Sequence, residues 1–345
     1  MIRSWVFEFL PEIADPAARA PARVSDYIHR YLDLWTRDEA LGFHGIFFSE
    51  HHFGGSYSPS PNLLIAALAG RTTRLRLGVM GIVTPYYHPT RIVEEIGLLD
   101  HLTRGRLEIG TAIGVPQELA RLGLSMEAAR GLNDEALEIV DSALGREEIA
   151  HEGTHYRFDA LRLVPRPRQE PSPPKWTTVV SPDSARKAAR RHSRICTGFA
   201  STAKIRDLFD IYREEAARVG FEVDASHFAI RRRVTIAETA VEAETRKVEM
   251  AERYRAFVAT DPRLAASMKT IGAPDTPGPK EGIQVSADEF ISGTPAEVRE
   301  QIEAQCAQTG AENFLAVLHW AAGFEEVARA HELFGREVIP ALGRA

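Results

Sequence analysis

The feature that most constrains the fold is a repeated alternation of short apolar runs with longer amphipathic segments. Eight of the short runs are typical of strands, namely 5–9, 45–50, 75–83, 106–114, 176–181, 195–200, 228–237 and 313–320. Between them lie segments with helical periodicity, among them 23–41, 90–102, 183–192, 203–219, 241–258, 296–308 and 324–338. Alternation of this kind builds parallel β/α units, and a count of eight favours closure into a (β/α)8 TIM barrel.

Two segments interrupt the alternation. Residues 157–176 are rich in proline and predict an extended surface connection ahead of the fifth strand. Residues 260–290 carry glycine and proline throughout, which predicts a long insertion after the seventh strand. Loops of that length in a compact domain often serve as active-site lids. We therefore expect one barrel domain over residues 1–345, with a mobile lid at about 260–290.

Charge and composition exclude several classes of function. The formal net charge is −6 and no run of Lys or Arg dominates the chain, so neither nucleic acid nor an anionic membrane is an expected partner. No apolar run reaches transmembrane length, and the first residues lack a signal-peptide pattern. The two cysteines, Cys196 and Cys306, are too few for a disulfide framework or a cysteine zinc site. These features fit a reducing cytoplasm.

The most reactive side chains gather where the second strand should end, in "FFSEHHFGG" (47–55). In a β/α barrel the active site forms at the C-terminal ends of the strands, which places Glu50, His51 and His52 at that rim. Neighbouring side chains diverge, so we expect one histidine to face the barrel mouth and the other to pack behind it. A structural or helix-capping pair is the alternative. A zinc site is disfavoured, because neither HExxH nor a cysteine pair is present.

A second candidate site lies at the turn "SPDSAR" (181–186), between the fifth strand and the helix that follows it. Ser181, Asp183 and Ser184 are good N-cap residues, and the free N–H groups of a helix N-terminus bind phosphate. Arg186 could add a cation, whereas the Asp183 carboxylate would repel an anion, so we expect Asp183 to offer only its backbone N–H. Helix capping without any ligand is the alternative interpretation.

Several motifs, taken in order, resemble the bacterial luciferase-like flavin-dependent monooxygenases. They are "SEHHF" (49–53), "LRLGVMGIVTPYYHPTRIVEEIGLLDHLTRGRLEIGTAIG" (75–114), "HEGTHYRFDALRLVPRPRQEPSPPKW" (151–176), "SPDSARKAA" (181–189), "GTPAEVREQI" (293–302) and "FEEVARAHELFGREVIP" (324–340). The resemblance implies a TIM barrel that binds reduced FMN at the strand C-termini. Such enzymes form a C4a-peroxyflavin with O₂ and oxygenate a small organic substrate with it.

The resemblance also assigns roles to individual residues. His51 takes the place of the catalytic histidine, for which an imidazole that exchanges protons near neutral pH is well suited. Glu50 takes the preceding acidic position beside the cofactor. Met80–Gly81 falls where the family often has a non-prolyl cis peptide against the flavin, and a plain strand glycine that permits close backbone approach is the alternative. The FMN phosphate is expected at Ser181, Asp183, Ser184 and Arg186.

One position departs from the resemblance. Luciferase has an arginine at the end of the fourth strand that holds the phosphate, and the matching residue here is Ile113. Isoleucine offers no bidentate contact to an anion. Beyond the third and eighth strands, Tyr86, Tyr87 and Trp320 are candidates for a substrate pocket, or they simply cover the barrel.

The cofactor's source and the partners follow from what the chain lacks and from the resemblance. No GxGxxG follows a strand and no P-loop is present, so we expect reduced FMN from a separate NAD(P)H:flavin reductase. The resemblance implies a homodimer. Hydride transfer with the deazaflavin F420 on the same fold, or a non-catalytic flavin-binding accessory protein, are the competing functions, and the sequence does not identify a substrate.

Overall fold

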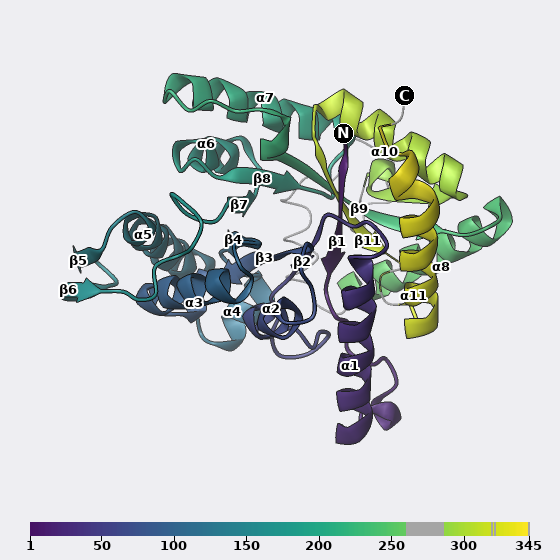
Figure 1. The fold of residues 1–345 in the computed structure, drawn as a ribbon, viewed down its shortest axis with the longest axis horizontal. Helices are drawn as coiled ribbons and strands as arrows, with labels where there is room; N and C mark the ends of the chain where they lie inside the picture. The colour runs from purple at the N-terminus through teal and green to yellow at the C-terminus, as the bar shows by residue number, and fades with distance from the viewer. Residues whose placement is uncertain (260–285, 319, 321, 344–345) are drawn as a thin grey trace.

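A computed structural model describes residues 1–259, 286–318, 320 and 322–343. Its centre is a closed barrel of eight parallel strands (Figure 1). These are β1 (Arg3–Glu8), β2 (Gly45–Phe48), β3 (Arg76–Val83), β4 (Leu107–Ala112), β7 (Lys175–Thr178), β8 (Arg194–Thr197), β9 (Phe228–Ile236) and β11 (Asn313–Leu318). Pairing of β8 with β9 closes the ring. The predicted TIM barrel is therefore confirmed, with several strands shorter at their ends than the apolar runs suggested.

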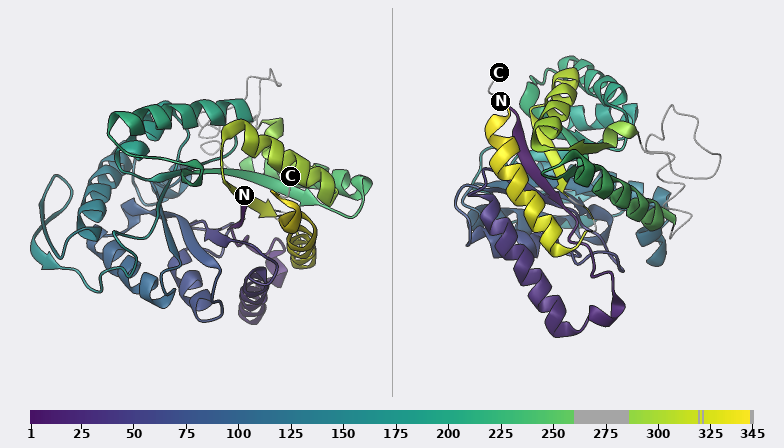
Figure 2. Two further views of the ribbon diagram at one scale, coloured as in Figure 1. Left: turned by 45° about the horizontal axis from the view of Figure 1, so that its top comes forward. Right: turned by 90° about the vertical axis from the view of Figure 1, so that its right-hand side faces the viewer.

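Helices surround the barrel, as Figures 1 and 2 show. They are α1 (Pro21–Asp38), α2 (Pro61–Ala69), α3 (Pro89–Leu102), α4 (Pro116–Arg121), α5 (Met126–Leu144), α6 (Pro182–Arg190), α7 (Thr202–Arg218), α8 (Ala240–Ala259), α10 (Pro295–Thr309) and α11 (Phe324–Leu333). A π-helical turn, Phe334–Val338, continues α11 over the rest of the predicted helical segment. Proline occupies the first turn of α1, α2, α3, α4, α6 and α10, where its missing N–H costs no hydrogen bond.

Two apolar cores follow from the alternation of side chains along the strands. The larger core lies between the outer face of the barrel and the helices, and it includes Ile46, Phe48 and Ile109. The smaller core fills the barrel itself and consists of Trp5, Phe7, Phe47, Met80, Trp176, Cys196, Ala229, Leu315 and Val317. Large aromatic side chains thus close the barrel interior, as is usual for this fold, and leave only its mouth for a ligand.

The first part of the predicted extended connection, residues 157–176, is a strand. Arg157–Arg162 forms β6, which is mostly exposed and pairs antiparallel with β5 (Glu148–Glu152). The hairpin projects from the side of the barrel that carries α3 and α5 (Figure 1). Its loop is held by the Glu135 carboxylate of α5, which accepts N–H groups from Thr154, His155 and Tyr156. A glutamate from the preceding helix stabilises this turn, and the composition of the hairpin itself does not reveal it.

The insertion after β9 begins with α8 and returns to the barrel through a short 3-10 turn, Ala287–Glu289, and a strand, β10 (Phe290–Gly293). Strand β10 pairs in parallel with β9. The predicted lid falls mainly on residues 260–285, which lie outside the described residues. In the part of the chain that is described, no helix combines the length and apolarity needed to cross a membrane.

Candidate functional site

The loop after β2 carries the three residues that the sequence singled out. Strand β2 ends at Phe48, so Glu50, His51 and His52 follow it at the C-terminal rim of the barrel, as expected. Short hydrogen bonds fix this loop: Ser58 Oγ donates to the Ser49 carbonyl at 2.7 Å, and the His51 N–H donates to the Ser58 carbonyl at 3.1 Å. Both histidines are therefore presented from a rigid segment.

His51 is paired with a carboxylate from a different element. Its Nδ1 lies 3.0 Å from Oε1 of Glu118, in the first turn of α4, and its ring stacks on Phe9 with centroids 5.8 Å apart. The His51 side chain is 29% exposed and that of Glu118 only 8%. A carboxylate at Nδ1 holds the proton on that nitrogen and leaves Nε2 free to exchange a proton with a ligand. This arrangement is suited to general acid–base chemistry.

His52 points to a different partner, as the divergence of neighbouring side chains predicted. Its Nε2 lies 2.9 Å from Oε1 of Glu50, whose side chain is 1% exposed. Tyr87 donates to the same oxygen at 3.0 Å, and the Val83 N–H donates to Oε2 at 3.2 Å. Both oxygens of Glu50 are thus engaged by protein groups. Glu50 therefore joins the loop after β2 to the end of β3. Because protein groups occupy both of its oxygens, Glu50 has less capacity to bind a ligand than the predicted contact with the cofactor implies.

Tyr86 brings a further polar group to this cluster. Its ring meets the edge of the His52 ring at 4.8 Å. Burial, together with the charges of Glu118 and Glu50, raises the pKa of Tyr86 to about 12, so its hydroxyl stays protonated. The Tyr86 hydroxyl and Oε2 of Glu118 are buried and have no hydrogen-bond partner among the described residues. Unpartnered buried polar atoms are rare in native structures and call for a ligand or water.

Strand β3 contributes backbone to the barrel mouth. The peptide bond between Met80 and Gly81 is cis, as the resemblance led us to expect, and the pairing of β3 with β4 shifts register between Val79 and Ile82. A Cβ at Gly81 would lie 2.6 Å from the Thr111 backbone, so only glycine fits against β4 here. Met80 packs in the barrel core with 5% exposure.

The N-terminus of α6 is built as the sequence suggested. Ser181 is the N-cap and forms a capping box with Ser184. The Ser184 hydroxyl accepts the N–H groups of Val180 and Ser181, at 3.1 and 3.0 Å. These bonds use several donors that a phosphate would need, and they leave the Asp183 N–H without an intrahelical acceptor. The Asp183 carboxylate is 79% exposed and Arg186 is exposed as well.

Two further predicted residues lie elsewhere on the rim. Ile113 directly follows β4 and is half-buried. Trp320 follows β11, where its ring meets the Tyr254 ring of α8 edge-on with centroids 5.9 Å apart. The structure therefore groups Glu50, His51, His52, Tyr86 and Tyr87 in one cluster, whereas the recorded ring contact of Trp320 is with Tyr254 of α8.

Sequence reasoning missed Glu118. Residues 115–118 read "VPQE" and follow the end of β4 after a single turn. Proline followed by an acidic residue marks the first turn of a helix, and the C-terminal end of a barrel strand marks the active-site rim. These two signals together could have identified Glu118 as a candidate site residue from the sequence. In the part of the chain that the structure describes, no group of three or more His, Cys, Asp or Glu side chains is arranged to hold a metal ion.

Known proteins resemble this chain over most of its length. The sequence profile described as Luciferase-like monooxygenase matches residues 9–313. An uncharacterized protein of Sinorhizobium fredii is 31% identical over 90% of this chain and 88% of its own length. Limonene 1,2-monooxygenase of Rhodococcus erythropolis is 28% identical over 94% of this chain and 84% of its own.

A solved structure supports the same assignment. Monooxygenase RslO1 from Streptomyces bottropensis superposes with a TM-score of 0.81 at 26% identity, covering 98% of this chain and 99% of that one. The oxygenating constituent of the 3,6-diketocamphane monooxygenase of Pseudomonas putida, solved with FMN, has a TM-score of 0.77 at 22% identity, with 99% and 98% coverage. The second likeness concerns the fold alone. On the profile match over most of its length, the chain belongs to the luciferase-like monooxygenase family.

Proposed function

We propose that the protein is the oxygenase component of an FMN-dependent two-component monooxygenase that oxygenates a small organic substrate. The observation that carries this proposal is the His51–Glu118 pair at the C-terminal rim of the barrel. In this proposal His51 is the catalytic residue, and Glu118 holds its imidazole in the tautomer that leaves Nε2 available. Members of the family are named monooxygenases, which supports the reaction class.

The residues at the barrel mouth fit a flavin. The apolar interior with Met80, the close backbone at Gly81 and the unpartnered Tyr86 hydroxyl suit a flat ring that carries polar edges. We assign the phosphate to the start of α6, where the Asp183 N–H has no intrahelical acceptor and Ser181, Ser184 and Arg186 belong to the same turn. With Ile113 in place of a cation, we expect the phosphate to be held weakly.

Bound reduced FMN would supply the electrons that activate O₂, so that one oxygen atom enters the substrate and the other leaves as water. The protein's own groups orient the reactants and hold or move the proton. His51 holds or moves a proton at Nε2, and Glu118 keeps Nδ1 occupied. Glu50 positions His52 and Val83, which keeps the loop after β2 and the end of β3 in fixed relation.

The relatives support a separate source of reduced flavin. The oxygenase component of the flavin-dependent trigonelline monooxygenase of Acinetobacter baylyi is 33% identical over 146 residues, 41% of this chain. A protein named as an oxygenase component works with another protein that delivers the electrons. We therefore assign an NAD(P)H:flavin reductase as the partner and O₂ as the co-substrate.

We assign a homodimer on the basis of exposed apolar side chains on two neighbouring helices. Leu63 on α2 is 71% exposed, and Leu98 and Leu102 on α3 are 52% and 47% exposed. Large leucines exposed together on packed helices are typical of an interface between copies. Sedimentation equilibrium of the wild type and of Leu98→Glu tests this, because a charge in the interface should yield monomers.

The cofactor and reaction class are tested by anaerobic titration with reduced FMN and, in parallel, reduced F420. We expect FMN to bind and its absorbance to pass through an oxygen-dependent transient when O₂ is admitted. Binding of F420 in place of FMN would refute the monooxygenase and indicate hydride transfer. Failure of both to bind would indicate an accessory protein.

His51→Ala tests the residue assignment, with His29→Ala on the exposed face of α1 as the matched control. We expect His51→Ala to leave flavin affinity nearly unchanged and to lower product yield, while His29→Ala alters neither. Equal yields from the two variants would remove His51 from the chemistry.

A further inference from the structure

Strand β9 carries an unusual row of buried polar side chains. Its sequence, Phe228–Ile236, contains three consecutive arginines, and all nine residues are buried. Ala229 lies in the barrel core beside Leu315 and Val317, so the alternation of the strand turns Arg231, Arg233 and Thr235 toward the same interior. The interior face of this strand is therefore cationic.

A single carboxylate serves all three arginines. Oε1 of Glu289 accepts from Arg231 at 3.1 Å and also from Arg233, and Oε2 accepts from Arg232 at 3.3 Å and from the Phe199 N–H at 2.7 Å. Glu289 is completely buried. Burial lowers the pKa of Arg233, since desolvation penalises its charge and Glu289 offsets only part of that cost. Two guanidinium groups thus face the barrel interior with one carboxylate between them.

Two other buried arginines, in contrast, have nearly all of their N–H donors hydrogen-bonded. Arg106, which is 8% exposed, donates five hydrogen bonds, all to backbone carbonyls or the Thr72 hydroxyl. Arg232 donates to Gln305, the Ala200 carbonyl, Glu289 and Thr202. Each uses most or all of the five N–H donors that an arginine offers. Both are structural.

Arg231 and Arg233 are as deeply buried, at 5% and 3% exposure, but much less satisfied. Among the described residues, the structure records Glu289 as the only hydrogen-bond acceptor for Arg231, and Glu289 and the neighbouring Tyr254 are the partners of Arg233. Nε of Arg233 is buried without an acceptor. Aromatic rings flank both groups, with Phe199 4.1 Å from Arg231 and Tyr254 4.0 Å from Arg233. Buried donors in such surroundings call for an anionic partner.

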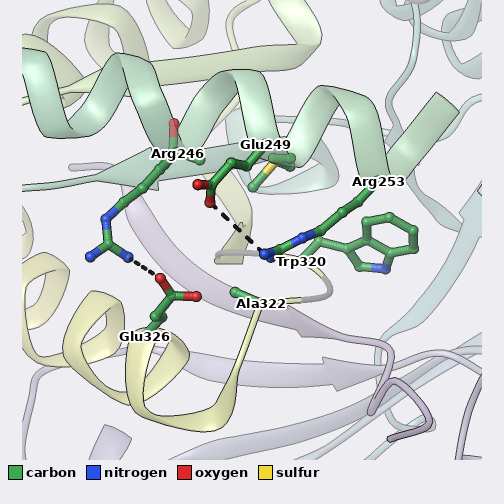
Figure 3. Close-up of a pocket in the computed structure, with 8 residues that line it drawn as sticks. Arg246, Glu249, Arg253, Trp320, Ala322 and Glu326 are labelled. Atoms are coloured by element: carbon green, nitrogen blue, oxygen red, sulfur yellow. Dashed lines mark hydrogen bonds and ion pairs between the residues drawn. The ribbon is translucent and has the colours of Figure 1, made fainter. Parts of the chain in front are cut away.

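The same row reaches a pocket between α8 and α11. Thr235 lines this pocket together with Arg246, Glu249, Trp320 and Glu326, most of which Figure 3 labels. The pocket's own cations are balanced. Arg246 pairs with Glu326 at 3.1 Å and with Glu242 at 2.7 Å, and Arg253 pairs with Glu249 at 3.9 Å. The Thr235 hydroxyl is buried and has no partner in the described part of the chain. Two buried donors without a recorded acceptor, Nε of Arg233 and the Thr235 hydroxyl, therefore lie on the same face of β9, and Thr235 lines the pocket.

We propose that Arg231 and Arg233 bind a carboxylate of the organic substrate, which would make the substrate an organic acid. This inference rests on the proposed monooxygenase function. The strand order places β9 four strands from β3 in either direction, so the arginines lie across the barrel from Met80–Gly81, which we assigned to the flavin ring. The expected phosphate site at α6 follows β7, two strands away from β9. An anion opposite the ring, between aromatic side chains, suits a substrate better than the cofactor phosphate.

The test uses flavin-free protein and benzoate as the probe, with benzamide as its neutral counterpart. Isothermal titration should show that benzoate binds at least tenfold more tightly than benzamide. Arg233→Gln and Arg231→Gln should each weaken benzoate binding at least tenfold, and Arg233→Lys should have a smaller effect because it keeps the charge. Arg206→Gln, at an exposed position of α7, is the control and should bind benzoate as the wild type does. Thermal melts establish that each variant is folded.

Two results would overturn the inference. Equal affinity for benzoate and benzamide in the wild type requires no variant and would show that no anion site exists. In titrations with reduced FMN and reduced riboflavin, a loss of FMN affinity alone in Arg233→Gln would assign the arginines to the cofactor phosphate. Benzoate binding is measured without flavin, so its failure would refute the anion site alone. The proposed function is tested separately, by FMN binding.

Discussion

Ile113→Arg tests how the phosphate is held. The register of β4 with β7 pairs Thr111 with Thr177, so its extension by two residues sets Ile113 opposite Val179, just ahead of the Ser181 N-cap. A guanidinium at this point can reach the first turn of α6. A hydrogen bond to a charged group contributes about 1.5–3 kcal/mol. Ile113 is only half-buried, and the arginine stem retains part of its apolar contact, so we expect a cost of about 1 kcal/mol at most.

The net gain of roughly 0.5–2 kcal/mol corresponds to FMN binding about 2- to 30-fold tighter, since 1.4 kcal/mol is a factor of ten. The assay is fluorescence titration of the wild type and the variant with FMN and with riboflavin, which lacks the phosphate. Ile113→Lys is the matched control, because it adds the charge without the bidentate geometry. Equal changes for FMN and riboflavin, or no change for either, would mean that the phosphate does not lie beside the end of β4.

Three further predictions concern other residues. Glu118→Ala should lower turnover about 10- to 100-fold, as loss of a charged hydrogen bond implies; unchanged ¹⁵N shifts of the His51 ring nitrogens would show that Glu118 does not set its tautomer. Asp38→Ala should lower the free energy of unfolding by about 3–5 kcal/mol in denaturant titrations, because it strands buried His331, whose Nδ1 lies 2.9 Å from Asp38; a loss below 1 kcal/mol would contradict this. Burial would raise the pKa of Glu39, but N–H groups of 73–75 lower it to about 2, so the stabilisation that Glu39→Gln removes at pH 7 should vanish as pH falls toward 2.

The barrel could be predicted from the sequence because each strand and helix has a local sequence pattern that indicates it. Apolar runs of strand length alternate with helical periodicity, and proline marks the helix starts, as at Pro89 and Pro182. The hairpin β5–β6 could not be predicted in the same way. Its stability depends on Glu135, which belongs to another element and accepts three backbone N–H groups of the turn. The proline-rich composition of residues 157–176 did not indicate β6, which pairs only with β5.

The part of the candidate site that lies in one local motif could be predicted, and the part that depends on contacts between distant residues could not. His51 and Glu50 stand in one short motif, whereas Glu118 is 67 residues from His51 and reaches it only through the closure of β2, β3 and β4 side by side. The sequence also shows three arginines inside an apolar strand, a signal of buried charge, but it does not show that one glutamate 56 residues later serves them all. Long-range polar pairs depend on register, and register is not visible in a single sequence.

The distribution of charge around the barrel mouth connects the two proposals. The chain has no cation at Ile113, where the phosphate is expected, and it places Arg231 and Arg233 across the barrel on β9. A weakly held phosphate suits a flavin that arrives reduced from another protein and leaves after turnover. A strongly cationic β9 suits a substrate that must be fixed while the cofactor exchanges. On this reasoning FMN should be lost on dialysis, and an organic acid should slow that loss in the wild type but not in Arg233→Gln. Equal rates of flavin loss with and without the acid would show that the two sites are independent.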